Sequence, residues 1–377
     1  MSDAPVRWCV GCMTGTSLDG LDAALVRVEG EGLSMSAEVV GHHAERLPEG
    51  LAGTLRSLAE GTAHPAADFL RAGREVGGLY ARGVAALLER CGAGVEVDLV
   101  AAHGQTVWHI GEEHLSWQLF DPWPLVREVG APVVFDLRQA DLIAGGQGAP
   151  ITPIADPILY GRDRRLAVVN LGGVCNYTVS LPAEGGGFPE VVAGDLCPCN
   201  LMLDGLARAL LGRPYDKDGE VGSTGRVDDG LVGLIEAAVG DSPRTLGREQ
   251  FGQAWVDGLI AKRPEVGAGD WLASAAGYVG RKLAGAIDGY GVERAVLAGG
   301  GSLNPALVAQ IAGASGQAGV WMTSEAAGIA GEAREAACFA VLGALSADGV
   351  PITLEGVTGA QNPGVAGSWA WPSSITG

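Results

Sequence analysis

The sequence predicts a mixed α/β protein built from two lobes of related design. In the N-terminal half, RWCVGC (residues 7–12), MTGTSLDG (13–20) and LDAALVRVEG (21–30) have the patterns of a strand, a glycine-rich turn and a second strand. In the second half, LAVVNLGGVCNYTVSL (166–181) repeats this plan around Gly172 and Gly173. One glycine hairpin in each half indicates duplicated lobes.

The segments that follow the hairpins add further strands and helices. Apolar residues have helical spacing over residues 66–90 and 271–290, whereas LVAAHGQTVWH (99–109) and SWQLFD (116–121) have strand patterns. With 377 residues, of which 47% are hydrophobic, the chain has material for two buried cores. We expect residues 1–140 plus about 350–377 to form the first lobe and residues 141–349 the second.

The segment DLIAGGQGAPITP (141–153) is the best candidate for a crossing between the lobes. Its glycines, Gly145, Gly146 and Gly148, either absorb a hinge rotation or let the backbone approach a ligand closely. Both uses stay open at this point.

The charge of the chain excludes two classes of partner. Its 25 basic and 44 acidic residues give a net charge of −19, so we expect neither nucleic acid nor an anionic membrane surface as a partner. No segment has 18 uninterrupted apolar residues, and the N-terminus lacks the apolar stretch of a signal peptide, which favours a cytoplasmic location. An anionic ligand would need backbone amides, helix N-termini, a few basic side chains and a bridging divalent cation.

The seven cysteines, an odd number, favour a reducing compartment over a disulfide framework. Cys9 and Cys12 form a CxxC pair, and Cys197 and Cys199 form a CxC pair, but no further His or Cys motif completes a zinc set. We therefore expect no structural metal.

The first glycine turn is a candidate phosphate site. Between residues 11 and 22 it offers consecutive backbone N–H groups, the hydroxyls of Thr16 and Ser17, and Asp19, which can hold Mg²⁺ through water. An ordinary surface turn has the same composition, but MTGTSLDG is longer than a hairpin needs. Because the chain has neither a P-loop nor a strand–GxGxxG–helix motif, a nucleotide would require another fold.

A second glycine turn lies in RAVLAGGGSLNPALVAQI (294–311). A strand precedes Gly299, Gly300 and Gly301, and Asn304 with Pro305 opens a helix. Such a turn suits close approach to a flat base or a phosphate, although a strand-to-helix turn needs glycine for steric reasons as well.

Asp195 follows the apolar strand VVAG, so its carboxylate would emerge at a strand end beside a helix that starts near Asn200. Asp195 is either a general base or a helix cap, a position that Asn200 could fill instead. Downstream, YDKDGEVGSTG (215–225) clusters Asp216, Lys217 and Asp218, either as a ligand loop or as a solvated turn.

Two polar segments of the first half suit a sugar site. His103, Gln105 and Thr106 follow the strand LVAA, and FDLRQAD places Asp136 and Arg138 at alternate positions, hence on one face. The Arg138 guanidinium can bind a substrate carboxylate in a bidentate fork, or it can form a salt bridge with Asp136 or Asp141.

The order of these segments resembles one protein family along nearly the whole chain. GCMTGTSLDGLDAALV is similar to the signature G-x-M-S-G-T-S-x-D-G-x-D of the anhydro-N-acetylmuramic acid kinases. Further segments resemble that family in the expected order: HGQTVWH, FDLRQADLIAGGQGAP, NLGGVCNYT, YDKDGEVGSTG, LAGGGSLNP, EAREAACFAVL and LEGVTGA. Chance does not account for eight such segments in one order.

The resemblance implies two actin-like (ribonuclease-H-like) lobes with an interlobe cleft, bound ATP, a requirement for Mg²⁺ and a homodimer. It implies a reaction in which water attacks the anomeric carbon of the sugar while the freed O6 takes the γ-phosphoryl group, with Asp195 as the base. The nucleotide would lie between the lobes. The phosphates would meet Gly15, Thr16, Ser17, Asp19, Gly20, Gly172 and Gly173. The adenosine would meet Gly299, Gly300, Gly301 and Asn304, and the sugar would meet His103, Gln105, Thr106, Asp136, Arg138 and Glu335.

Two departures from the family pattern stand out. Thr14 replaces the more usual Ser and keeps a hydroxyl, whereas DLCPCN (195–200) stands where the common form is D-T-G-P-G-N. The second change removes a hydroxyl and two glycines beside Asp195. Another sugar or acetate kinase of the same superfamily, or a non-catalytic ATP-binding regulator, are the alternative interpretations.

Overall fold

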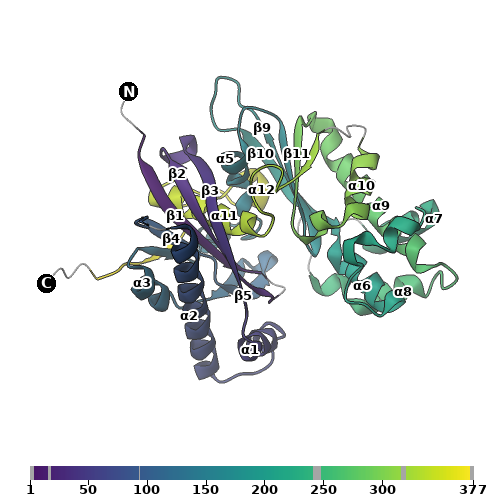
Figure 1. Cartoon of the computed structure of the whole chain (residues 1–377), viewed down its shortest axis with the longest axis horizontal. Helices are drawn as coiled ribbons and strands as arrows, with labels where there is room; N and C mark the ends of the chain where they lie inside the picture. The colour runs from purple at the N-terminus through teal and green to yellow at the C-terminus, as the bar shows by residue number, and fades with distance from the viewer. Residues whose placement is uncertain (1–3, 16–17, 93, 241–247, 316–319, 374–377) are drawn as a thin grey trace. The chain divides into compact units, whose positions relative to one another are not determined.

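The computed structural model describes residues 4–15, 18–92, 94–240, 248–315 and 320–373. The predicted phosphate-site residues Thr16 and Ser17 lie outside these ranges. The chain forms two compact units. Unit 1 combines Met1–Gly161 with Glu332–Gly377, and unit 2 consists of Arg162–Gly331 (Figure 1).

The described part of unit 1 contains a six-stranded sheet in the order β13–β7–β4–β1–β2–β3. β1 pairs antiparallel with β2 and β2 with β3, whereas β1, β4 and β7 run parallel to one another. The strands are β1 (Val6–Thr14), β2 (Gly20–Glu29), β3 (Ser36–Arg46), β4 (Leu99–Ala102), β7 (Val133–Phe135) and β13 (Ser368–Ala370). A separate hairpin consists of β5 (Gln105–Ile110) and β6 (Leu115–Leu119).

Two long helices cover the two faces of this sheet, because successive side chains of a strand point to opposite faces. Val10 and Cys12 of β1 pack with Tyr80 and its neighbours on α2 (Ala66–Cys91). Gly11 faces α11 (Ala333–Ala347) so closely that an added Cβ would lie 1.8 Å from the Ala336 carbonyl oxygen. The other helices of unit 1 are α1 (Glu49–Ala59), α3 (Trp123–Val129), α4 (Gln139–Ile143), α5 (Asp156–Tyr160) and α12 (Glu355–Thr358).

Unit 2 repeats the strand order of unit 1. Its described residues form a five-stranded sheet, β10–β9–β8–β11–β12, in which β8, β9 and β10 are antiparallel and β8, β11 and β12 are parallel. The strands are β8 (Leu166–Leu171), β9 (Val174–Leu181), β10 (Glu190–Pro198), β11 (Arg294–Ala298) and β12 (Trp321–Thr323). A three-stranded meander followed by two parallel strands, present in both units, confirms the predicted pair of ribonuclease-H-like lobes.

The core of unit 2 lies between this sheet and its helices. Trp271 and Tyr278 of α9 are buried there with Met202 of α6 and with β8 residues such as Val169. The helices are α6 (Asn200–Leu211), α7 (Asp229–Val239), α8 (Gln253–Ile260), α9 (Ala268–Ile287) and α10 (Pro305–Ala314). No helix in the described ranges is long and apolar enough to cross a membrane.

Three features differ from what the sequence pattern suggested. Residues 141–161 and 332–349 belong to unit 1, not to the second lobe, so the chain passes between units after residue 161 and after residue 331 rather than within 141–153. The first hairpin tip is shorter than MTGTSLDG, because β1 extends to Thr14 and β2 starts at Gly20. The tip therefore has the usual length of a hairpin connection, and this length does not indicate a ligand site.

The third difference concerns Asp136 and Arg138. β7 ends at Phe135, Asp136 has a positive φ of 57°, and Arg138 is the residue before α4. The two side chains therefore lie in a turn, and strand alternation does not place them on one face.

Candidate active site

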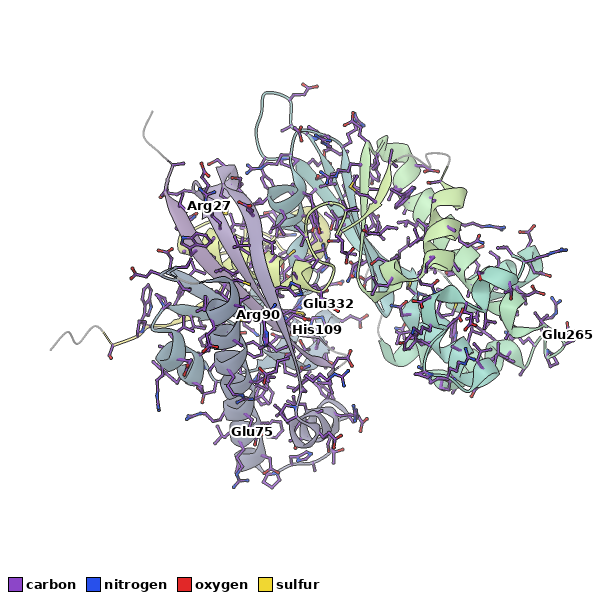
Figure 2. All side chains as sticks on the ribbon, in the orientation of Figure 1. Arg27, Glu75, Arg90, His109, Glu265 and Glu332 are labelled. Atoms are coloured by element: carbon purple, nitrogen blue, oxygen red, sulfur yellow. The ribbon has the colours of Figure 1, made fainter. Side chains whose placement is uncertain are left out.

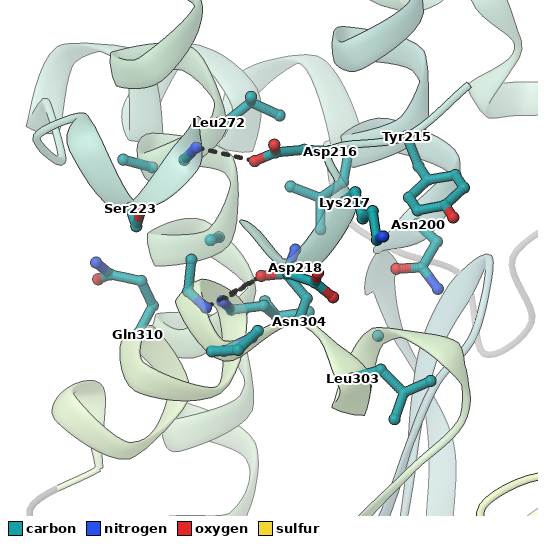
Figure 3. Close-up of a pocket in the computed structure, with 18 of the residues that line it drawn as sticks. Asn200, Tyr215, Asp216, Lys217, Asp218, Ser223, Leu272, Leu303, Asn304 and Gln310 are labelled. Carbon is teal, nitrogen blue, oxygen red and sulfur yellow. Dashed lines mark hydrogen bonds between the residues drawn. The ribbon is translucent and has the colours of Figure 1, made fainter. Parts of the chain in front are cut away.

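A cavity of about 740 Å³ lies in unit 2, within the usual size range of small-molecule sites. It is bounded by α6, by the loop that follows α6, by α9 and by the start of α10 (Figure 3). Its apolar lining includes Leu203, Leu272, Ala273, Ala276, Leu303 and Leu307. Its polar lining includes Asn200, Asp204, Lys217, Asp218, Ser223 and Gln310.

Three of the four predicted adenosine-site residues line this cavity: Gly300, Gly301 and Asn304. The fourth, Gly299, has a φ of 79°, and a Cβ there would lie 2.4 Å from Oδ1 of Asn170. A Cβ on Gly301 would lie 2.8 Å from Cβ of Leu171. The triple glycine therefore lets the turn after β11 pack against the end of β8.

Asn304 is the N-cap residue of α10. Its Oδ1 accepts hydrogen bonds from the backbone N–H groups of Ala306 and Leu307, at 3.1 and 3.2 Å, and so caps α10. The capped first residues of α10, Pro305, Ala306 and Leu307, line the cavity.

The tip of the second hairpin is bonded to Asn200, one of the residues that line the cavity. Gly172 and Gly173 join β8 to β9, and the backbone N–H of Asn200 donates to the Gly172 carbonyl at 3.0 Å. The Asn200 side chain donates to the Leu171 carbonyl, also at 3.0 Å. Since Asn200 lines the cavity, the predicted phosphate turn and the predicted adenosine turn are joined through this residue.

Asp195 lies inside β10 rather than at its end, next to a bulge that shifts the register between Asp195 and Cys197. The N-cap of α6 is Cys199, which makes no side-chain capping bond, and Asn200 is the first helical residue. Neither Asp195 nor Asn200 therefore caps the helix. A bulge re-aims side chains relative to a regular strand, a device common beside functional sites.

The altered segment DLCPCN turns its cysteines into the core. Cys197 and Cys199 are fully buried with Cys175 and Met202. All seven cysteines lie in the described ranges and carry thiols rather than disulfides. The two cysteines that replace glycine thus occupy core volume, and their side chains do not crowd the solvent-facing side of β10.

The sugar-site candidates of unit 1 gather around a buried histidine. His103 Nδ1 donates to the Gly104 carbonyl at 3.0 Å, and its Nε2 accepts from Nε of Arg138 at 3.0 Å. Burial, reinforced by Arg138, holds the pKa of His103 well below its usual value, so the imidazole is neutral. Burial lowers the pKa of Arg138 to about 10, which leaves it charged at neutral pH.

Arg138 is held on its other side by the glycine segment. Its Nη1 donates to the Gly148 carbonyl at 2.5 Å, and Gly148 N–H donates to the buried Asp141 at 2.6 Å. A Cβ on Gly146 would lie 2.2 Å from Oδ2 of Asp141. Glycines of the 141–153 segment thus allow close backbone approach, and Asp141 makes its bonds to Gly148 and Thr358 instead of a salt bridge.

The β5–β6 hairpin adds a polar network that includes Thr106, one of the predicted sugar-site residues. Gln118 Nε2 donates to Thr106 Oγ1 at 3.3 Å and to Ser116 Oγ at 2.7 Å, and His109 Nδ1 lies 2.9 Å from Ser116 Oγ. Gln105 Nε2 donates weakly to the Gly15 carbonyl at 3.4 Å. The pairing of β5 with β6 assembles this network, and no single segment reveals it.

A group of carboxylates lies near the first glycine turn. Burial, with the like charges of Glu335, Glu332 and Asp19, raises the pKa of Asp22 from 3.8 to about 7. Asp19 and Glu332 are exposed, the latter at the start of α11 (Figure 2). Asp22 is the last acid of the GTSLDGLD motif, but the sequence pattern alone does not predict its raised pKa.

The family model described as anhydro-N-acetylmuramic acid kinase matches residues 7–372 of the chain. The chain belongs to the anhydro-N-acetylmuramic acid kinase family. A family member from Salinibacter ruber is 36% identical over 392 residues, covering 97% of this chain and 96% of the relative. Another from Streptomyces coelicolor is 34% identical over 374 residues, covering 95% and 92%.

Among solved structures, the chain is similar to a ROK family glucokinase from Streptomyces griseus in complex with glucose and AMPPNP. That structure has a TM-score of 0.38 and 16% identity, and the match covers 89% of this chain and 98% of the glucokinase.

The Thr14 departure from the anhydro-N-acetylmuramic acid kinase pattern has a physical account in the structure. The hydroxyl of Thr14, which replaces the usual Ser, shares a hydrogen bond of 3.0 Å with the buried Tyr80 hydroxyl. The Thr14 hydroxyl is therefore hydrogen-bonded in the interior of unit 1.

Proposed function

We propose that this chain is an ATP-dependent kinase that opens the 1,6-anhydro ring of anhydro-N-acetylmuramic acid and phosphorylates O6. The products are N-acetylmuramic acid 6-phosphate and ADP, formed in cell-wall recycling. The observation that carries the proposal is the family match over residues 7–372. Asp195, the first residue of the altered DLCPCN segment, is the base that the resemblance implies.

In the proposed reaction Asp195 acts as general base. It takes a proton from the water that attacks the anomeric carbon, the bond from that carbon to O6 breaks, and O6 attacks the γ-phosphorus of ATP. Attack on an acetal carbon by water is accelerated by a carboxylate base, whereas phosphoryl transfer depends chiefly on alignment and charge neutralisation. The bulge next to Asp195 and the inward orientation of Cys197 and Cys199 support this role.

We assign the adenosine of ATP to the cavity of unit 2. The apolar side chains of Leu272 and Ala276 suit a flat base, and Gly300 permits close approach. Gly172 and Gly173 would supply backbone contacts to the phosphates, as would Gly15, Asp19 and Gly20 at the first hairpin tip. That the nucleotide lies between the two units stays a prediction.

Mg²⁺ fits the chemistry of the first turn. In the described ranges no three His, Cys, Asp or Glu side chains gather to hold a metal directly, so a cation would be held through phosphate oxygens and water. Asp19 is the proposed residue, and the carboxylates that raise the pKa of Asp22 are hard oxygen donors with like charges. Bound Mg²⁺ would neutralise charge on the phosphates.

On the sugar, we propose that Arg138 pairs with the lactyl carboxylate. Nε and Nη1 of its guanidinium are engaged by His103 and Gly148, which orients the group before substrate arrives. Gln105, Thr106, Asp136 and Glu335 remain proposed sugar contacts. A cytoplasmic location and a homodimer are further proposals that rest on the sequence and the resemblance.

The test is a coupled assay of ADP release with anhydro-N-acetylmuramic acid, with glucose and acetate as controls. Turnover only with the anhydro sugar, and a product that carries phosphate on O6, would support the proposal. Turnover with glucose or acetate alone would favour another kinase of the superfamily, and nucleotide binding without any turnover would favour a regulator.

A further inference from the structure

We propose that Lys217 is the residue of unit 2 that binds the phosphates of the nucleotide, and that it sets the preference of the cavity for nucleotides over nucleosides. This inference rests on the proposed function, because it takes the cavity to be the adenosine site. It gives a role to the segment YDKDGEVGSTG, whose lysine the reaction described above does not use.

Lys217 lies in the wall of the cavity, on the side of the predicted phosphate turn. Lys217 starts a 3₁₀ turn, Lys217–Gly219, that contributes to the cavity wall. Figure 3 shows Lys217 on the side of the cavity where Asn200 lies, whereas Gln310 and Ser223 lie on the other side. Asn200 is bonded to Leu171 and Gly172 at the tip of the second hairpin, so the Lys217 side is the side of the predicted phosphate turn.

The segment is anchored at its base. Asp216 is buried and accepts hydrogen bonds from the backbone N–H groups of Val221 and Gly222, at 3.0 and 2.9 Å. Gly219 has a φ of 66°, and a Cβ there would lie 2.3 Å from Oδ1 of Asn304. The turn that carries Lys217 is thereby fixed to the cap of α10, while the lysine side chain is exposed and makes no ion pair with described residues.

Among the described residues, the charged side chains that line the cavity are acidic apart from Lys217. Lys217 is the only basic side chain among the described residues that line the cavity, which also has the carboxylates of Asp204, Asp216 and Asp218. The whole chain has three lysines and a net charge of −19. A nucleotide phosphate entering this acidic site would be repelled without a local cation, and a lysine ammonium is a common phosphate partner.

The opposite end of the cavity suits the base. Gln310, which Figure 3 shows on the side of the cavity away from Lys217, offers an amide, and the α9 lining is apolar, with Leu272, Ala273 and Ala276. The side-chain amide of Gln310, on α10, makes no hydrogen bond with the described part of the chain. With the base near Gln310 and the phosphates near Asn200, Lys217 lies on the phosphate side of the cavity, so its effect should depend on the phosphates.

The experiment compares ADP with adenosine by isothermal titration calorimetry on the full chain, without sugar. We expect Lys217→Met to weaken ADP binding about tenfold, as for loss of a charge-assisted hydrogen bond, and to leave adenosine binding within about twofold of wild type. Lys217→Arg should retain most of the ADP affinity because it keeps the charge. Lys262→Met, the same change on an exposed residue outside the cavity, is the control and should change neither affinity.

Salt gives a second readout. Added salt should weaken ADP binding more in the wild type than in Lys217→Met, because only the wild type has the screened charge pair. Equal weakening of ADP and adenosine by Lys217→Met, or no weakening of either, would overturn the inference. If the wild-type chain bound neither ligand, the assignment of the cavity to adenosine would itself be wrong.

Discussion

Replacement of Asp22 by Asn should raise the free energy of unfolding at neutral pH, because it removes a carboxylate whose charged form is disfavoured by burial. The pKa of Asp22 is raised from 3.8 to about 7, first by burial and then by Glu335, Glu332 and Asp19. Between these two pH values the folded state binds more protons at this site than the unfolded state does. The contribution of Asp22 to the free energy of unfolding therefore falls as pH rises from about 3.8 to about 7.

The size of the effect follows from the two pKa values. Their separation of about 3 corresponds to at most about 4 kcal/mol, lost at about 1.4 kcal/mol per pH unit. Asn cannot ionise, so Asp22→Asn should match the wild type near pH 4 and exceed its unfolding free energy by several kcal/mol at pH 8. Urea denaturation followed by circular dichroism at a series of pH values measures this difference.

Two controls separate the cause from a general charge effect. Glu75→Gln, on the exposed face of α2, should leave the pH dependence unchanged. Glu335→Gln should lower the pKa of Asp22 and so reduce the loss of stability with rising pH. An advantage of Asp22→Asn that is the same at pH 4 and pH 8 would refute the reasoning, because it would not come from ionisation of Asp22.

Three further predictions concern single side chains. Asp195→Asn should lower kcat by at least about 10²- to 10⁴-fold with ATP affinity nearly unchanged, and near-wild-type turnover in the folded variant would remove Asp195 from the mechanism. Arg138→Lys should raise KM for the anhydro sugar while KM for ATP stays nearly constant; equal changes in both would count against a sugar contact. Arg334→Met should cost about 3–5 kcal/mol of stability, because it removes the guanidinium that binds the buried Asp156 carboxylate at 2.6 and 2.7 Å. The double variant with Asp156→Leu should recover most of that loss in urea denaturation, and an equal loss in both variants would contradict the ion-pair explanation.

Local patterns were enough to predict the strands and turns that define each lobe. The strand–glycine–strand plan at residues 7–30 and 166–181 corresponds to β1–β2 and β8–β9, and the helical spacing at 66–90 corresponds to α2. Asn304 and Pro305 mark the start of α10 as expected. These features depend on neighbours in sequence, since alternation, helical periodicity and capping each involve only a few consecutive residues.

Other expectations failed because they depended on contacts distant in sequence. Helix α11 joins the first unit because Gly11 leaves room for it and Arg334 pairs with Asp156. No pattern around residues 332–349 indicates that partner, which is 178 residues away.

What the sequence by itself determined is the family, the order of its segments and the strand, turn and helix of each. Only the tertiary structure decided where the chain divides, that Cys197 and Cys199 pack inward, that His103 and Gly148 hold Arg138, and that Asp22 binds its proton up to about pH 7. The physical reason is that burial and electrostatic interaction depend on which surfaces meet in space. Residues far apart in the chain supply those surfaces, so their effects exist only in the folded protein.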